Sequence, residues 1–185
     1  MKTYYLIIIS FLVVALGCEK DKDLSKTPPE TPQLVKYDLN DDSADDFTIE
    51  YRWFTWDGIN SSGDGISGIM EPLNQNSILF KRKEFTLFNQ LNDTIKMEVT
   101  EPLYWETFQA DLISISNSSE NNYLWPNEWK IQSNTTQSSY YLGVKLKENE
   151  SFLIGWVKFR IEKSTGEIQI IDKKLTLDSY IVIDK

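Results

Sequence analysis

The stretch 37–47, which reads YDLNDDSADDF, concentrates side-chain oxygens at regular spacing. A tightly curled loop can point the oxygens of such residues at one centre, and Ca²⁺ takes six to eight oxygen ligands. The spacing therefore predicts a calcium site, with a backbone carbonyl at Ala44 as a further ligand. The predicted side-chain ligands are Asp38, Asn40, Asp42 and Asp46. The alternative is an acidic, solvated loop without an ion, which must tolerate five like charges within nine residues.

The spacing resembles the D-x-[DN]-x-D-G-x-x-D loops of FG-GAP and integrin-type repeats. It does not match an EF-hand, because Ile49 stands where the twelfth-position glutamate would be. The resembling loops usually have Gly at position six, where this chain has Ser43. If that position needs a positive φ, a non-Gly residue costs about 1–2 kcal/mol. The resemblance implies a structural calcium ion, held weakly enough to suit roughly millimolar extracellular calcium.

The elements that would position this loop are β-strands. In FTIEYRWFTW, Phe47, Ile49, Tyr51 and Trp53 fall on one face, as expected of a strand with one buried side. About ten similar runs, separated by turn-forming clusters, predict an all-β fold: an antiparallel β-sandwich, jelly-roll-like, over residues 37–185. The clearest hairpin is RIEKSTGEIQI, in which Gly166 supplies the positive φ of the turn. We expect the stretches 56–76 and 117–130 to be long loops.

Composition excludes several classes of chemistry. The chain has 185 residues, a net charge of −9 and no histidine, so His-dependent catalysis and His-ligated zinc are excluded. Its acidity argues against nucleic acid as a partner. A single cysteine excludes an internal disulfide and Cys-rich metal sites.

That cysteine instead belongs to an N-terminal signal. An apolar run from Tyr4 to Leu16 is too short to span a bilayer but suits a signal peptide over residues 1–17. The sequence ALGC resembles a bacterial lipobox, which implies a diacylglycerol on Cys18. The following EKDKD resembles the export tags of Bacteroidota surface lipoproteins, or is simply a solvated tether. Residues 18–36, rich in Pro and Thr, predict a flexible stalk.

The C-terminal strands resemble those of a largely uncharacterised group of secreted bacterial β-sandwich domains. Their pattern, Y-hydrophobic-G-hydrophobic-K/R … G-W-hydrophobic-K/R … I-x-D, is matched at Tyr141, Gly143, Lys145, Gly155, Trp156, Lys158, Ile170 and Asp172. The resemblance implies fold and compartment rather than activity. Trp156 is expected in the core, as are Trp53 and Trp105.

Trp125 and Trp129 lie in a polar, Pro-broken segment, where they either pack the loop onto the sandwich or remain exposed as a sugar-stacking patch. The sequence thus predicts an outer-membrane lipoprotein with a non-enzymatic binding role. The alternative is a glycan-binding accessory protein whose partners are a glycan or another envelope protein. A two-carboxylate glycoside hydrolase remains a further alternative, although no motif marks its catalytic pair. Asp93-Thr94-Ile95 also resembles a Bacteroidota O-glycosylation pattern, with Thr94 as the acceptor.

Overall fold

The alternating run that begins at Phe47 forms the long strand β2 (Phe47–Asp57), around which the first sheet is built. The computed structural model describes residues 24–81, 86–132 and 140–184. The first sheet has the order β1-β2-β3-β7-β8, and its pairs are antiparallel. Its other strands are β1 (Val35–Tyr37), β3 (Ser62–Pro72), β7 (Ala110–Ser116) and β8 (Lys130–Ile131).

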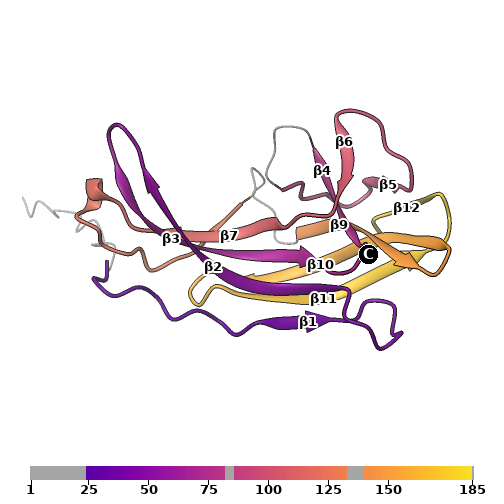
Figure 1. Ribbon diagram of the computed structural model, residues 1–185, viewed down its shortest axis with the longest axis horizontal. Coiled ribbons are helices and arrows are strands. Elements are labelled where there is room, and N and C mark those ends of the chain that lie inside the picture. Colours follow the sequence, from indigo (N-terminus) through magenta and orange to yellow (C-terminus); the bar gives the residue numbers. More distant parts are fainter. Residues whose placement is uncertain (1–23, 82–85, 133–139, 185) are drawn as a thin grey trace, which may run out of the picture.

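The second sheet has the order β11-β10-β9-β4-β6 and is also antiparallel. It faces the first sheet (Figure 1), which confirms the predicted all-β sandwich. Its strands are β4 (Ser77–Lys81), β6 (Leu103–Glu106), β9 (Tyr140–Glu148), β10 (Ser151–Glu162) and β11 (Glu167–Thr176).

The two faces of the second sheet bury different residues. On β10, Val157 and Phe159 join the main core between the sheets, whereas Ile154 and Trp156 join a smaller core on the opposite face. A small third sheet of β5 (Thr94–Lys96) and β12 (Tyr180–Val182) packs on that smaller core through Ile95 and Ile181. Because both faces are covered, β9 and β10 read as continuous apolar runs rather than alternating ones.

The predicted loop at 56–76 is wrong, since most of it forms β3, paired along the whole of β2. Gly63 lies opposite Trp56 and Gly65 opposite Phe54. A Cβ on Gly65 would lie 2.2 Å from Cζ of Phe54, so these rings cover the backbone of β3 where it lacks side chains. The Gly- and Ser-rich sequence therefore forms a strand because aromatic rings of β2 supply the packing that its own residues lack.

The β2–β3 hairpin extends beyond the rest of the first sheet (Figure 1). The predicted core position of Trp53 is wrong, because this residue is 57% exposed. Beside the turn of the hairpin, where the Ser62 N–H donates to the Ser119 hydroxyl at 3.2 Å, the segment between β7 and β8 contains a short 3₁₀ helix, η1 (Ser119–Asn121). No helix among the described residues is long and apolar enough to cross a bilayer.

Candidate functional site

The aspartate stretch is the connection 38–46 between β1 and β2, which pair as a hairpin with Tyr37 opposite Phe47. Its backbone is curled by side-chain acceptors: Asp38 accepts the N–H of Ser43 at 2.7 Å, and Asp42 accepts the N–H of Ala44 at 2.8 Å. Ser43 has φ 72°, so the position where the resembling calcium loops carry Gly does adopt the left-handed conformation.

Neighbouring groups shift the pKa of Asp38 in this loop. Desolvation acts to raise the pKa of Asp38, but backbone N–H groups of the loop and the charge of Lys173 together outweigh it and hold the pKa below its ordinary value. The Lys173 ammonium lies 3.4 Å from the Asp38 carbonyl oxygen and 3.4 Å from the Asp41 carboxylate. This lysine comes from β11, so it ties the loop to the second sheet.

Asp46 is the one predicted ligand that is fully buried. Its carboxylate accepts the N–H of Leu39 at 2.7 Å and the side-chain amide of Asn76 at 2.9 Å. Desolvation raises the pKa of Asp46, and the charges of Asp42 and Asp38 raise it further. The side chain therefore acts as an interior anchor that pins the loop to the body of the sandwich.

The predicted calcium ligands differ in their surroundings. Asp38, Asn40 and Asp42 lie in the outer part of the loop, whereas both oxygens of Asp46 accept hydrogen bonds from protein donors. Across the residues that the structure describes, no three acidic side chains are arranged to hold a metal ion. Each oxygen of Asp46 accepts one hydrogen bond and keeps a further lone pair, so calcium binding by Asp38, Asn40, Asp42, Ala44 and Asp46 stays a prediction.

Trp125 and Trp129 are buried, with 4% and 2% of their surfaces exposed. Trp129 lies under the β10–β11 turn, where a Cβ on Gly166 would lie 2.4 Å from its ring. Gly166 has φ +78°, which confirms its predicted turn conformation. The backbone of Trp125 exchanges two hydrogen bonds with that of Ser25 in the N-terminal segment, at 2.9 and 2.7 Å, and its ring meets Trp53. The prediction of an exposed sugar platform at these two tryptophans is therefore wrong, and the alternative of a loop packed by its aromatics holds.

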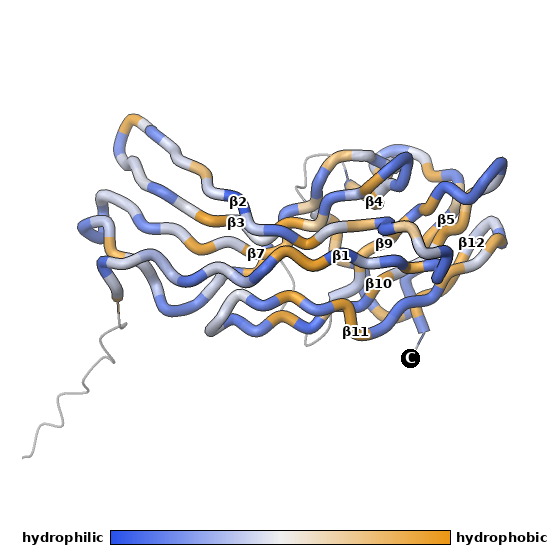
Figure 2. Tube along the Cα trace, turned by 60° about the horizontal axis from the view of Figure 1, so that its bottom comes forward, coloured by the Kyte–Doolittle hydropathy of each residue, from blue (hydrophilic) through white to orange (hydrophobic). Residues whose placement is uncertain are grey.

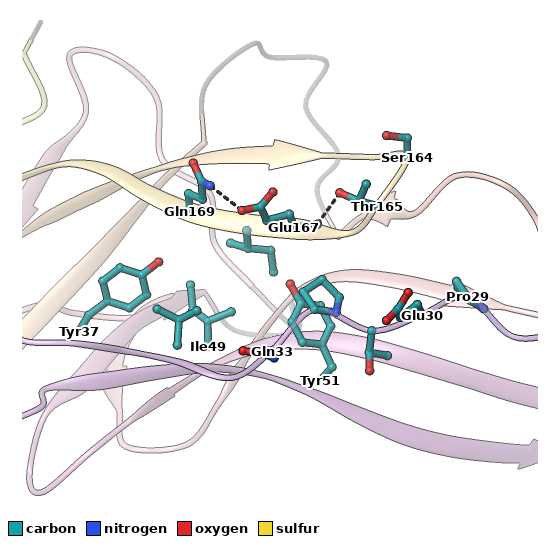
Figure 3. Close-up of a pocket in the computed structure, with 14 residues that line it drawn as sticks. Pro29, Glu30, Gln33, Tyr37, Ile49, Tyr51, Ser164, Thr165, Glu167 and Gln169 are labelled. Atoms are coloured by element: carbon teal, nitrogen blue, oxygen red, sulfur yellow. Dashed lines mark hydrogen bonds between the residues drawn. The ribbon is translucent and has the colours of Figure 1, made fainter.

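A groove of about 740 Å³ lies at the open seam of the sandwich. It runs between the N-terminal segment and β2 on one side and the β10–β11 hairpin on the other (Figure 3). Its lining residues are Pro29, Glu30, Thr31, Pro32, Gln33, Val35, Tyr37, Ile49, Tyr51, Ser164, Thr165, Glu167, Ile168 and Gln169.

The two tyrosines of the groove are held by backbone contacts across the seam. The Tyr51 hydroxyl donates to the Gly166 carbonyl at 2.7 Å, and the Ile170 N–H donates to the Tyr37 hydroxyl at 3.4 Å. Desolvation raises the pKa of Tyr51 well above its ordinary value, so the hydroxyl remains a donor at neutral pH. The edge of the Tyr51 ring meets Trp129 at 5.7 Å between centroids. The buried tryptophan thus shapes the groove from below instead of contacting a ligand.

Polar groups face the groove from both walls. Gln33 and Glu30 lie on the N-terminal wall, and Glu167 and Gln169 lie on the β11 wall, where they bond to each other (Figure 3). The lining contains two carboxylates and no lysine or arginine. The groove combines aromatic and aliphatic surface with amide, hydroxyl and carboxylate oxygens, and it has no group to neutralise an anionic ligand.

Sequence reasoning missed this groove because it assigned residues 18–36 to a stalk. Within the described part of that range, β1 pairs with β2 and Ser25 pairs with Trp125, so the predicted stalk is wrong from Leu24 onward. The two prolines, Pro29 and Pro32, lie in the groove wall. The usable signal was the alternation of Val35 and Tyr37 immediately before the aspartates.

The two predicted modification sites lie elsewhere. Thr94 is exposed at the start of β5, next to buried Ile95, and its glycosylation stays a prediction. Cys18 lies outside the described residues, as does the predicted signal peptide.

The chain has no match in the three comparisons made. No protein-family model matches the sequence, no curated protein matches it, and no solved structure matches the fold. The function must therefore be inferred from the chemistry of the groove and of the loops themselves.

Proposed function

We propose that the protein is a lipid-anchored cell-envelope protein that binds a neutral oligosaccharide in the seam groove, without catalysing a reaction. The observation that carries the proposal is the lining of the groove, which places Tyr37 and Tyr51 among amide, hydroxyl and carboxylate groups. The proposal keeps the glycan-binding alternative of the sequence but moves its site from the buried tryptophans to these tyrosines.

The chemistry of the lining favours a neutral polyol. Sugar C–H faces pack on aromatic rings, while hydroxyl groups require closely spaced donors and acceptors, which Gln33 and Gln169 provide from opposite walls. Glu30 and Glu167 accept hydrogen bonds from hydroxyls and repel anions. Phosphorylated and carboxylated ligands are therefore disfavoured, whereas uncharged sugars suit both the apolar and the polar parts of the groove.

The anchor and the location rest on the lipobox-like sequence before Cys18. A diacylglycerol on this residue would hold the protein at the outer membrane, because several acyl chains together give stable attachment. The test is metabolic labelling with an alkyne-tagged fatty acid in cells that express the wild type or Cys18→Ala. Label in the wild type and none in the variant supports the anchor, and equal label in both contradicts it.

Binding is tested on the mature chain from residue 18 with Cys18→Ser. An array of neutral and anionic oligosaccharides identifies a binder, and calorimetry then compares the parent with Gln33→Ala and Gln169→Ala. Each loss of a hydrogen bond should weaken binding roughly fivefold, since such a bond contributes about 1 kcal/mol. Tyr180→Ala, which removes an exposed tyrosine outside the groove, is the matched control and should bind as the parent does.

Two results would overturn the proposal. Affinity unchanged in both glutamine variants would place the ligand elsewhere, and a preference for anionic sugars would contradict the charge of the groove. Release of shorter products from the bound sugar, lost in Glu30→Gln or Glu167→Gln, would replace simple binding by glycoside hydrolysis with this carboxylate pair.

A further inference from the structure

The projecting β2–β3 hairpin places apolar side chains at one end of the molecule. Ile59, in the turn, is completely exposed, and Trp53 and Tyr123 are 57% and 51% exposed. Figure 2 shows the hydrophobic turn flanked by hydrophilic residues on both strands. We call the end of the molecule that carries the exposed residues Leu24, Trp53, Ile59 and Tyr123 the hairpin end.

The segment between β7 and β8 braces the hairpin at three points. Trp53 packs edge-on against Trp125, with 5.7 Å between ring centroids. The Tyr123 hydroxyl lies 3.2 Å from that of Ser62 on β3. The N–H of Asp64 donates to the side chain of Asn117 at 2.9 Å. Apolar side chains on a braced hairpin keep their exposure, because the chain cannot fold them inward.

The chain enters the described structure at this same end. Leu24 directly precedes Ser25, whose backbone bonds Trp125, and Figure 1 shows the first described residues, η1 and the β2–β3 turn together at one end of the long axis. Cys18 lies six residues before Leu24, and six residues reach no farther than about 20 Å. An acylated Cys18 would thus hold the hairpin end, and not the opposite end, next to the bilayer.

We infer that the hairpin end docks onto the lipid bilayer to which the protein is anchored, with Ile59 and Trp53 in the interfacial region. This inference rests on the lipid anchor of the proposed function. An indole ring suits the boundary between headgroups and acyl chains. The hairpin also carries Asp57 and Asp64, neither of which forms an ion pair with another described residue. Because these carboxylates would repel anionic headgroups, the contact suits zwitterionic lipid.

With the hairpin end docked on the membrane, the seam groove would lie on the side of the molecule and would not face the bilayer. The groove runs along the side of the molecule, between β1 and β11, and not across the hairpin end (Figures 1 and 3). A bound oligosaccharide would therefore lie within reach of the membrane surface without competing with the lipid for the same side chains.

The test supplies the anchor chemically, so that it does not depend on natural acylation. Cys18 is the sole cysteine, and the mature chain from Cys18 can be coupled through its thiol to a maleimide lipid in phosphatidylcholine vesicles. Vesicles with brominated acyl chains should quench part of the tryptophan fluorescence. That part should fall in Trp53→Phe, in which Trp56 remains on the same hairpin, and fall at least twofold in Ile59→Asn. Leu177→Asn, an exposed leucine outside the hairpin end, should be quenched like the wild type.

Other outcomes identify what else covers the hairpin end. Equal quenching in the wild type and Trp53→Phe, with folding of each verified by near-ultraviolet circular dichroism, would overturn the inference. If the coupled wild-type chain is not quenched and forms dimers, the hairpin end is the interface with a second copy of the chain. Stronger quenching with added phosphatidylglycerol would contradict the apolar contact, because the acidic hairpin should be repelled by anionic lipid. Failure of fatty-acid labelling with normal quenching would refute the natural anchor alone.

Discussion

Asp46 has a structural role that its place in the aspartate stretch does not reveal. Its position in the sequence marks the end of a calcium-type spacing, and its buried carboxylate accepts hydrogen bonds from the Leu39 N–H and the Asn76 side-chain amide. The same Asn76 accepts the N–H of Lys147 at 2.8 Å, so Asp46 links the loop to β9 of the second sheet. The residue thus stabilises the contact between the two sheets.

We expect Asp46 to contribute to the pH dependence of the free energy of unfolding. Because desolvation raises its pKa above the ordinary value of 3.8, the folded state binds the proton more tightly than the unfolded state. Its contribution is most favourable at low pH and is lost as the pH rises through the folded pKa. Urea unfolding between pH 3.5 and 7 should show this component in the wild type and not in Asp46→Asn.

The same variant should be less stable at neutral pH. An asparagine amide placed against the Leu39 N–H leaves one buried donor without an acceptor, which costs about 1–3 kcal/mol. A wild-type free energy of unfolding at pH 7 in Asp46→Asn would show that the carboxylate contributes nothing through these bonds.

Calcium is tested in the outer loop by Asp42. A thermal melt of the mature chain should shift upward in millimolar calcium relative to EDTA, since an ion that binds only the folded state stabilises it. The shift should vanish in Asp42→Ala, whereas Asp178→Ala in the β11–β12 turn should retain it. Identical curves in all conditions would leave the aspartates a loop closed by its own hydrogen bonds and by Lys173.

At the level of elements, the β2–β3 hairpin depends on the pairing of aromatic rings with glycines. A Cβ on Gly63 would lie 2.4 Å from the Asn117 carbonyl oxygen, whereas on Gly65 it would meet mainly the ring of Phe54. Backbone cannot move aside as easily as a partly exposed ring. The two glycines should therefore respond differently to the same substitution.

We expect Gly63→Ala to lower the free energy of unfolding by about 1–3 kcal/mol, the usual cost of overpacking. Gly65→Ala should cost less, and adding Phe54→Ala should remove part of that cost, because the two positions are in contact. Denaturant unfolding of the single and double variants measures both effects. Additive losses in the double variant would show that ring and glycine do not pack on each other.

Elements whose own residues carry their signal could be predicted from the sequence. The first half of β2, the two long strands β10 and β11 and the Gly166 turn follow from alternation and turn chemistry. β3 could not be predicted, because the side chains that pack it belong to β2. The groove could not be predicted either, since Pro29 and Pro32 indicate an extended chain without saying that the chain lies against a sheet. Burial of Trp125 and Trp129 could not be predicted either. Trp125 pairs with Ser25 and Trp129 packs under Gly166, and both partners are distant in the sequence.

At the level of the whole molecule, the N-terminal segment 24–34 is part of the domain and not a spacer. It pairs with Trp125 and forms one wall of the seam groove. A chain beginning at Val35 should therefore melt about 2–4 °C lower for a loss of about 1 kcal/mol in a domain of this size, and should lose oligosaccharide binding. Calorimetry of the truncated and mature chains measures both. Equal melting temperatures would restore the interpretation of this segment as a stalk.

The pairing of Ser25 with Trp125 also has a mechanical meaning. A pull on the protein away from its anchor is carried along the chain and reaches these two hydrogen bonds first, before β1 or any strand of the core. Under tension the segment would peel from the sandwich and take one wall of the groove with it. A ligand that bridges that wall and β11 would resist the peeling, so that binding strengthens the attachment of the domain and tension weakens the hold on the ligand.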